Sequence, residues 1–268
     1  MRTTHYLFLV ITLTTLFTSC AKSPLGRNQL KLYSSSQLAG MGEQAFAGMK
    51  SEQKVSSQPM SNQYVQCIAD AITQHVPKSV FDGEWELVVF DSPQINAFAL
   101  PGGKIGVYTG ILNVTENQDQ LAAIIGHEVG HVIENHSNER LSSEHLSQSS
   151  MALAGATLES QGVVNRDLYM SGLGLGLQYG VLMPYGRTHE SEADIVGQDL
   201  MAKSGFNPKA SIKLWKNMAA LNSNATTPEF MSTHPSNKRR INELTEHLPI
   251  AEKLYDENKA VNCQRPAM

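Results

Sequence analysis

Apolar residues recur at steps of three and four between Leu121 and Ile133, and this period predicts an amphipathic helix. They form one stripe: Leu121, Ile124, Ile125, Val129, Val132 and Ile133. Asn117, with Gln120 three residues later, offers a side-chain cap for the first turn. We therefore expect a helix that starts at Asn117 and packs its stripe into a core.

The same stretch contains His127, Glu128 and His131 in the order H-E-x-x-H. A step of four residues on a helix brings both imidazoles to one face, where they can bind one metal ion, and zinc is the ion that fits best. Glu128 falls within the apolar arc, where an unpaired carboxylate is costly to bury. A cation nearby, with a water for the carboxylate to bind, would explain its position. A helix with two surface histidines is the alternative until a further ligand is identified.

Two helices are predicted before this motif. The first runs from about Gln37 to Met49. The second ends at Pro77, and its apolar period indicates packing only: Val65, Ile68, Ile72 and Val76.

The period changes to two between the second helix and the H-E-x-x-H helix. Glu86 to Phe90 is a predicted strand, and Ile95 to Leu100 is expected to pair with Lys104 to Tyr108 across Pro101-Gly102-Gly103. An exposed edge of such a sheet can pair with an extended peptide through backbone groups. The alternative is a purely structural hairpin.

Residues 142–185 are rich in Ser, Gly, Ala and Leu, with charged or amide side chains between the apolar stretches. No window in this segment is a convincing membrane span. Gly172, Gly176 and Gly180 lie four apart and would present a smooth helical face for close packing. We predict that this segment belongs to the core.

A further helix is predicted from Arg187, and Gly205 closes it. Glu190 and Asp194 are four apart and share a face, as the two histidines do. This pairing suits a third metal ligand together with a carboxylate that orients a histidine. A solvated acidic helix start is the alternative, and it describes Glu192 well.

Composition excludes one class of partner. The chain has 268 residues, 41% of them hydrophobic and 17% charged, so it can bury a substantial core. Its formal net charge is -4 and its pI is about 6.1, which leaves no basic footprint for nucleic acid. We expect no nucleic-acid partner.

The N-terminus has the features of an exported lipoprotein. Arg2 precedes an apolar run from Tyr6 to Phe17, which is too short to span a bilayer and long enough for a signal-peptide core. Residues 16–21 resemble a bacterial lipobox, in which Cys20 receives lipid such as palmitate and becomes the new N-terminus. An ordinary secretory signal with an incidental cysteine is the alternative. We expect a signal peptide at 1–19, a lipidated N-terminus and tether at 20–33, and one domain at 34–268.

Two cysteines then remain in an exported chain, Cys67 and Cys263. An oxidising compartment favours a disulfide between them. Two buried free thiols are the alternative.

Several motifs together resemble the HtpX and CAAX-prenyl-protease family of zinc metallopeptidases, in the gluzincin group. Besides H-E-x-x-H, they are Asn96 to Gly103 before the active-site helix, R-x-x-E-x-E-A-D at 187–194, and Ser232-Thr233-His234-Pro235 with Arg240. They cover roughly residues 60 to 245. The chain lacks the transmembrane helices of membrane-embedded members, so the nearest resemblance is to lipoproteins of Gram-negative outer membranes.

The resemblance implies an α+β fold, mainly helical, with a small sheet or hairpin beside the H-E-x-x-H helix. It implies one zinc ion per chain, held by His127, His131 and Glu190, with water in the fourth position. Glu128 would take a proton from that water and deliver it to the departing amine. Asp194 would orient a ligand.

The resemblance also places the turn at His234 near the zinc. His234 would either donate a hydrogen bond to the oxyanion or occupy the fourth zinc position and exclude water, and we favour the second use. Arg240 would hold this loop or the oxyanion.

We accordingly predict a zinc metalloendopeptidase that hydrolyses unfolded or misassembled envelope proteins as quality control. It would be anchored by lipid to the bacterial outer membrane and would face the periplasm. The outer-membrane assembly machinery and another envelope protease are candidate partners. A chaperone-like binding protein with little hydrolysis, on the same fold, is the alternative.

Overall fold

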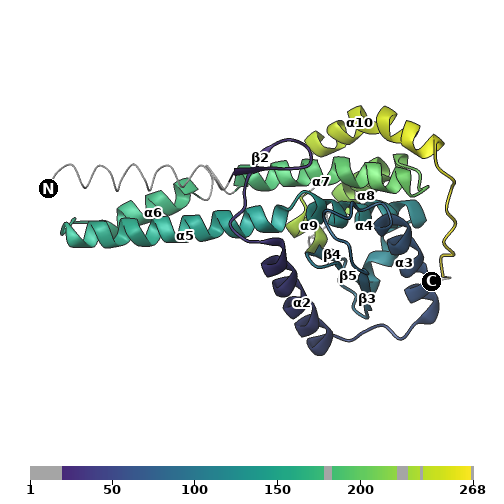
Figure 1. Ribbon diagram of the computed structural model, residues 1–268, viewed down its shortest axis with the longest axis horizontal. Helices are drawn as coiled ribbons and strands as arrows, with labels where there is room; N and C mark the ends of the chain where they lie inside the picture. The colour runs from purple at the N-terminus through teal and green to yellow at the C-terminus, as the bar shows by residue number, and fades with distance from the viewer. Residues whose placement is uncertain (1–19, 178–182, 222–228, 236–237, 267–268) are drawn as a thin grey trace. The chain divides into compact units, whose positions relative to one another are not determined.

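The computed structural model describes residues 20–177, 183–221, 229–235 and 238–266, and most of them are helical (Figure 1). The helices are α2 (Ser35–Glu52), α3 (Pro59–Thr73), η2 (Thr109–Asn113, a 3-10 helix), α4 (Gln118–Ile133), α5 (His136–Ser160), α6 (Arg166–Leu177), α7 (Met183–Lys203), α8 (Lys209–Leu221), α9 (Glu229–Thr233) and α10 (Lys238–Asp256). Two small sheets accompany them, which confirms the predicted α+β class.

A three-stranded sheet has the order β3-β5-β4, with β3 at Glu86–Phe90, β4 at Ala97–Leu100 and β5 at Lys104–Tyr108. The predicted β4–β5 hairpin is confirmed as an antiparallel pair, and β3 runs parallel to β5. Gly102 and Gly103 have φ angles of 89° and 72°, which glycine adopts without steric cost. Because β5 lies in the middle of the order β3-β5-β4, strand β4 lies at an edge of the sheet.

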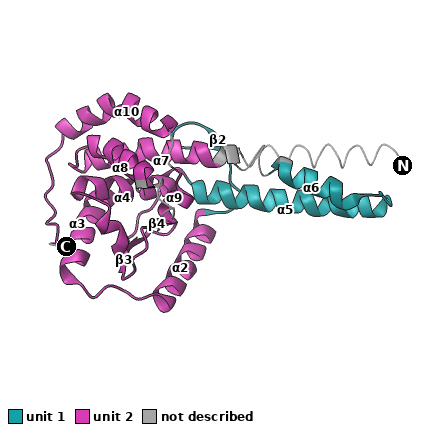
Figure 2. Ribbon diagram, turned by 180° about the vertical axis from the view of Figure 1, so that it is seen from behind, with its two compact units in different colours: residues 1–34, 135–184 teal, residues 35–134, 185–268 magenta. Residues whose placement is uncertain are grey.

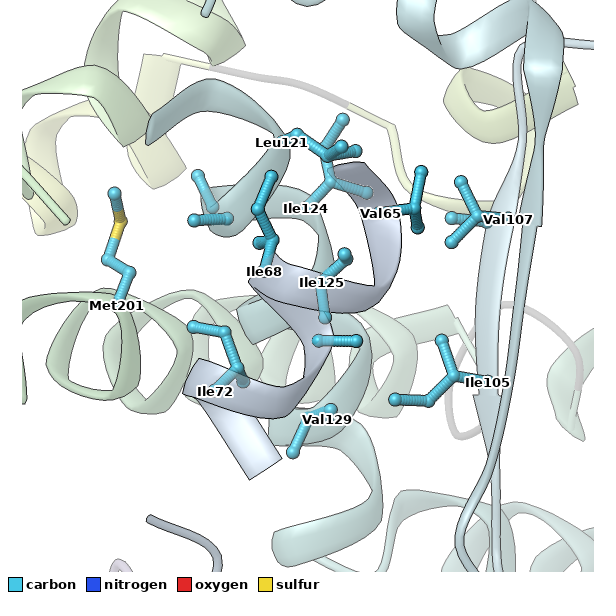
Figure 3. Close-up of a cluster of buried hydrophobic side chains, with 14 of the residues drawn as sticks. Val65, Ile68, Ile72, Ile105, Val107, Leu121, Ile124, Ile125, Val129 and Met201 are labelled. Atoms are coloured by element: carbon cyan, nitrogen blue, oxygen red, sulfur yellow. The ribbon is translucent and has the colours of Figure 1, made fainter. Parts of the chain in front are cut away.

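Helix α4 contributes Leu121, Ile124, Ile125 and Val129 to the main core (Figure 3). It packs against α3, α8 and β4, and its apolar side chains meet those of α3 and β5. The predicted cap is present, because the Asn117 side chain accepts a hydrogen bond from the Gln120 backbone N–H at 3.0 Å. Tight packing on three sides fixes the helix that carries the metal-binding motif.

The chain divides into two compact units (Figure 2). Unit 2 comprises residues 35–134 and 185–268, and it contains every residue of the metal site. Unit 1 comprises residues 1–34 and 135–184. The segment 34–268, predicted as one domain, thus contributes to both units.

In unit 1, two findings differ from the sequence-based expectations. Residues 20–33, expected to be a tether, contain an antiparallel hairpin of β1 (Cys20–Lys22) and β2 (Asn28–Leu30). Polar side chains hold it to α5, as shown by Arg27, which donates to both oxygens of buried Glu139 at 2.6 and 2.7 Å. The segment 142–185, expected to belong to the core, does not do so in its described part, since many of its leucines are exposed. Residues 1–19 lie outside the described part of the chain, as does Gly180.

In unit 2, the C-terminal segment after α10 is tied to α3 by a disulfide between Cys67 and Cys263, with Cα atoms 5.8 Å apart. Gln118 supports the same segment, since its side chain donates to the Val261 carbonyl and accepts from the Cys263 N–H, both at 2.7 Å. The disulfide expected from the cysteine count is thus geometrically in place, and it closes a separation of 196 residues.

Among the described residues, no helix is both long and apolar enough to cross a membrane.

Candidate metal centre

Two glycines bring α7 against α4. A Cβ atom on Gly126 would lie 2.8 Å from the Gly197 carbonyl oxygen, and one on Gly130 would lie 2.8 Å from the Ala193 carbonyl oxygen. Real Cβ atoms do not tolerate such contacts, so any larger residue would push the helices apart. The glycines flank His127 on α4, and the close approach places the acidic face of α7 against the histidines.

Four side chains on three segments converge at this contact. His127 and His131 come from α4, Glu190 comes from α7, and His234 follows α9. One ligand atom from each lies within 4.8 Å of all the others. The two Nε2 atoms of His127 and His131 are 3.1 Å apart, and each is 3.4 Å from a carboxylate oxygen of Glu190. The sequence predicted the first three as ligands, and the structure brings them together.

These donors suit zinc. A tetrahedral zinc ion with bonds of 2.0–2.2 Å to imidazole and carboxylate has ligand atoms about 3.3 Å apart. The donor separations described above match this spacing. Two imidazoles and one carboxylate also form one of the usual donor sets of catalytic zinc. The residues present therefore fit the ion that the motif predicted.

His234 lies at the fourth corner of this group. Its Nδ1 atom is 3.1 Å from His127 Nε2 and 3.0 Å from Glu190 Oε1. Its other nitrogen, Nε2, is 3.4 Å from Glu128 Oε1. The ring thus stands between the ligands and the predicted base, where an attacking water would have to bind. This position matches the second of its two predicted uses.

Glu128 is buried on the site side of α4, with 4% of its surface exposed. Its Oε1 atom has no hydrogen-bond partner within the described part of the chain. Burial raises the pKa of its carboxyl group above the ordinary value, and the nearby His234 and His127 oppose this rise. A buried carboxylate with an unused oxygen beside the ligands can accept a proton from a water molecule there.

Asp194 and Arg240 hold the predicted ligands in place through hydrogen bonds and ion pairs. The His127 ring donates from Nδ1 to Asp194 Oδ1 at 3.0 Å, which leaves Nε2 directed at the other donors. Arg240 donates to both oxygens of Asp194 at 2.6 and 2.8 Å and lies 2.9 Å from Glu190 Oε2. It also donates to the Pro235 carbonyl at 3.2 Å. This last contact is the one required by the first of the two roles predicted for Arg240, holding the loop of His234.

In this network, burial and the neighbouring side chains shift each pKa in opposite directions. Burial raises the pKa of Asp194, but the Arg240 guanidinium outweighs it and the net pKa is low. Burial likewise raises the pKa of Glu190, but hydrogen bonds from the three histidines, His127 first, hold it well below its usual range. For His127, burial lowers the pKa, but the hydrogen bond to Asp194 and the neighbouring Glu190 raise it to about 9. The same negative surroundings that retain a proton on this imidazole attract a metal cation.

The sequence did not single out Trp215, a buried residue of α8. The centroid of its ring lies 5.3 Å from that of His127, and the Arg240 guanidinium stacks 3.8 Å above its face. It also stacks on Phe230, at 5.8 Å, one turn before His234. One side chain therefore contacts a ligand, the arginine and the segment leading to His234. The apolar period of 209–221 shows a packed helix but not which pocket its tryptophan fills.

Replacement of Glu190 by alanine should remove most of the bound metal. The loss of a ligand should cost more than the roughly 10- to 100-fold in affinity lost when a supporting hydrogen bond is removed. Elemental analysis of purified Glu190→Ala measures the occupancy directly. Glu192→Ala, two residues further along the same helix, is the matched control and should retain its zinc. Full occupancy in Glu190→Ala would remove Glu190 from the ligand set.

A helix bearing H-E-x-x-H, with a glutamate ligand from a second helix, defines a metallopeptidase site of the gluzincin type. Residues 59–248 match peptidase family M48, and the chain belongs to this family. The resemblance found in the sequence is thereby confirmed.

Known metallopeptidases are similar to this chain over much of its length. Mitochondrial metalloendopeptidase OMA1 of Schizosaccharomyces pombe is 39% identical over 172 residues, which cover 64% of this chain and 49% of that protein. Metalloprotease YcaL of Escherichia coli is 26% identical over 250 residues, 89% of this chain and 95% of YcaL. A β-barrel assembly-enhancing protease of Yersinia pestis is 24% identical over 211 residues, 77% of this chain and 43% of that protein. The chain thus spans about half the length of the OMA1 and Yersinia proteins.

Proposed function

We propose that this chain is a zinc-dependent metalloendopeptidase that cleaves unfolded or misassembled envelope proteins as a quality-control enzyme. One observation carries the enzymatic part of the proposal: a complete donor set, His127, His131 and Glu190, lies beside the buried and partly unsatisfied carboxylate of Glu128. A site that only bound metal for stability would have no use for a buried base.

The residues divide the chemistry between them. Zinc, when held by the three ligands, supplies a Lewis acid that polarises the peptide carbonyl and acidifies a water. Glu128 accepts the proton of that water and later gives it to the departing amine. Asp194 keeps His127 in the tautomer whose Nε2 faces the metal, and Arg240 keeps Asp194 ionised. The raised pKa of Glu128 makes it a stronger base than a solvent-exposed glutamate.

An extended peptide is the substrate shape that the sheet favours. Strand β4 lies at the edge of the sheet, and α4 packs beside it. A chain in β conformation can add to such an edge through its backbone N–H and C=O groups. Folded proteins rarely present a free extended segment, whereas unfolded ones do. This geometry supports unfolded polypeptides as the substrate class.

The N-terminal residues support an anchored enzyme facing the periplasm. The apolar run from Tyr6 to Phe17 followed by Cys20 favours lipid attachment, and the Cys67–Cys263 disulfide suits an oxidising compartment. The name of the Yersinia relative makes the outer-membrane assembly machinery a candidate partner, and another envelope protease is a second candidate. Mass spectrometry of the membrane-extracted protein tests acylation, and an unmodified Cys20 would contradict the anchor.

Incubation with an unfolded protein tests the activity. We expect the purified chain to cut a reduced and alkylated protein into peptides, because such a substrate offers extended segments. A chelator should abolish cleavage, and added zinc should restore it. The same protein in its folded, disulfide-bonded form is the control and should stay intact. Cleavage that persists after the metal has been removed would contradict the mechanism.

A chaperone-like protein on the same fold is the alternative function. It would suppress aggregation of the unfolded protein and release no peptides. The retained base Glu128 favours the peptidase, and the incubation described above separates the two outcomes.

Replacement of His234 by alanine should raise the cleavage of a short peptide several-fold. In the structure the imidazole stands between the ligands and Glu128, so its removal opens the place where water must bind. Initial rates of His234→Ala and wild type at equal zinc occupancy measure the effect, with His247→Ala on α10 as a control away from the site. A fall of roughly 10²–10³-fold would instead assign His234 to oxyanion stabilisation. Equal rates would show that it has neither role.

A further inference from the structure

Most of the large hydrophobic side chains that are exposed in the described part of the protein belong to unit 1, the smaller unit. Several of these side chains are largely exposed: Val164 is 80% exposed, and Leu153 and Leu168 are each 71% exposed. Those on α5, on α6 and in the link between them are Leu146, Leu153, Val164, Leu168, Tyr169, Leu173 and Leu175. In unit 2 such residues are fewer and scattered over different elements. Large exposed apolar patches are typical of surfaces that contact another protein or a membrane. We call it the α5–α6 surface.

The α5–α6 surface has almost no charge along its length. The sequence contains no Asp, Glu, Lys or Arg from 145 to 158, and none from 168 to 186. The charges nearest to the link are Glu159 and Arg166, which lie 3.6 Å apart and offset each other, and Asp167. Electrostatic attraction therefore contributes little to whatever covers this surface, and the interaction has to be hydrophobic.

On α6 the exposed side chains cover a broad arc. At about 100° per residue, Leu168, Tyr169, Leu173 and Leu175 together span roughly 160° of the helix surface. The opposite side faces α5, where a Cβ atom on Gly155 would lie 3.6 Å from the Met170 methyl carbon. A fluid acyl phase adapts to such an arc, whereas a folded protein partner would need a groove shaped to enclose it.

The membrane-directed end of the chain enters the same unit. Cys20 is the first residue of β1, and the apolar run from Tyr6 to Phe17 ends three residues before it. The β1–β2 hairpin is fixed to α5 by the Arg27–Glu139 ion pair and by the Leu32 N–H, which donates to Ser142 Oγ at 2.9 Å. Because the hairpin that begins at Cys20 is fixed directly to α5, a bilayer that holds the N-terminus lies within reach of unit 1.

We propose that the α5–α6 surface lies in the interface of a lipid bilayer, with its leucines among the acyl chains and Tyr169 at the level of the head groups. The choice of a bilayer as occupant rests on the lipid anchor proposed above. In this arrangement α5 and α6 would lie along the surface of the bilayer. Because the surface is nearly uncharged, binding should need neither anionic lipid nor low salt.

Spin labels on the intact, acylated chain test this proposal. Nitroxides at Leu153→Cys and Leu168→Cys report the surroundings of the two helices in vesicles of phosphatidylcholine. We expect both labels to collide more with oxygen, which concentrates in lipid, than with a polar nickel chelate. Labels at Met60→Cys and Ile250→Cys in unit 2, where the native side chains are 53% and 58% exposed, are the controls and should prefer the nickel chelate. High salt should leave all four results unchanged.

The outcomes separate this proposal from the lipid anchor. If the chain floats with the vesicles but the labels at 153 and 168 prefer the nickel chelate, the proposal is overturned and the anchor stands. Dipolar broadening between labels on two copies, without contact with lipid, would overturn it in favour of a dimer interface. A chain that does not associate with vesicles at all overturns both.

A second set of variants checks that the labels did not create the effect. In a full chain carrying Cys20→Ser, which cannot be acylated, vesicle binding should persist at a reduced level. Adding Leu153→Gln, Leu168→Gln and Leu175→Gln should lower the vesicle partition coefficient at least about tenfold, since each removes an apolar side chain from the interface. Met60→Gln with Ile250→Gln should leave it unchanged, and equal losses in the two sets would overturn the proposal. All variants should still cleave a short soluble peptide.

Discussion

Glu128→Gln is expected to keep its zinc and to lose peptide hydrolysis by about 10²–10⁴-fold, the contribution typical of a general acid–base group. The amide has the shape of the carboxylate but cannot accept the proton of the attacking water. Glu128 is absent from the donor group, which consists of His127, His131, Glu190 and His234, so the metal should remain. Cleavage rates together with elemental zinc measure both halves of the prediction.

Two features of the site make this test sharp. Glu128 Oε1 has no hydrogen-bond partner in the described part of the chain, so the amide breaks no existing hydrogen bond at that atom. Burial raises the pKa of the carboxyl group, which means that the neutral side chain is already the less costly form to bury. Glu128→Gln should therefore fold at least as well as wild type. Glu144→Gln, a change on α5 outside the site, is the control, and wild-type rates in Glu128→Gln would contradict the mechanism.

Local patterns predicted the elements that carry the chemistry. The cap at Asn117, the apolar period and the two histidines all fall within seventeen residues from 117 to 133, so the sequence alone specified α4. The β4–β5 hairpin was equally local, since Gly102 and Gly103 both need positive φ. These signals depend on neighbours in the chain, and a single sequence displays them directly.

Interactions between residues far apart in the sequence could not be predicted from such patterns. Glu190 follows His131 by 59 residues, and only its helical spacing from Asp194, together with a family resemblance, suggested a ligand. The bond from Arg240 to Asp194 spans 46 residues, and nothing in the period of either helix encodes it. Trp215 was missed for the same reason, since its position beside His127 follows from how α8 packs on α4.

The prediction of a core at 142–185 was wrong for its described part because composition does not identify a partner. Alanine, glycine and leucine favour a packed helix, and α5 and α6 do pack on each other. Two helices bury only their facing sides, and Leu153 and Leu168 remain exposed. Similarly, residues 20–33 lack an apolar period, yet Arg27 and Gln29 fold them onto Glu139 by polar contacts that period analysis ignores.

Arg240→Ala is expected to lower the free energy of unfolding by about 3–5 kcal/mol, the usual cost of removing one partner of a buried ion pair. Arg240 is 1% exposed and holds two carboxylates, Asp194 and Glu190, in the interior of unit 2. Without the guanidinium, both negative charges stay buried with less compensation, and Trp215 loses the group stacked on its face. Chemical denaturation of the metal-free protein measures the loss.

The neighbouring arginine provides the matched control for this prediction. Arg239 forms an exposed ion pair with Glu243 at 2.6 Å, so Arg239→Ala should cost less than about 1 kcal/mol. A double variant, Asp194→Leu with Arg240→Leu, should cost less than the sum of its two single changes, because it leaves no unpaired charge at position 194 or 240. If Arg240→Ala were as stable as Arg239→Ala, Asp194 would have to be neutral or hydrated in the folded protein. The hydrogen bond that orients His127 would then lack a charged acceptor. That result would contradict the proposal that an ionised Asp194 orients this zinc ligand.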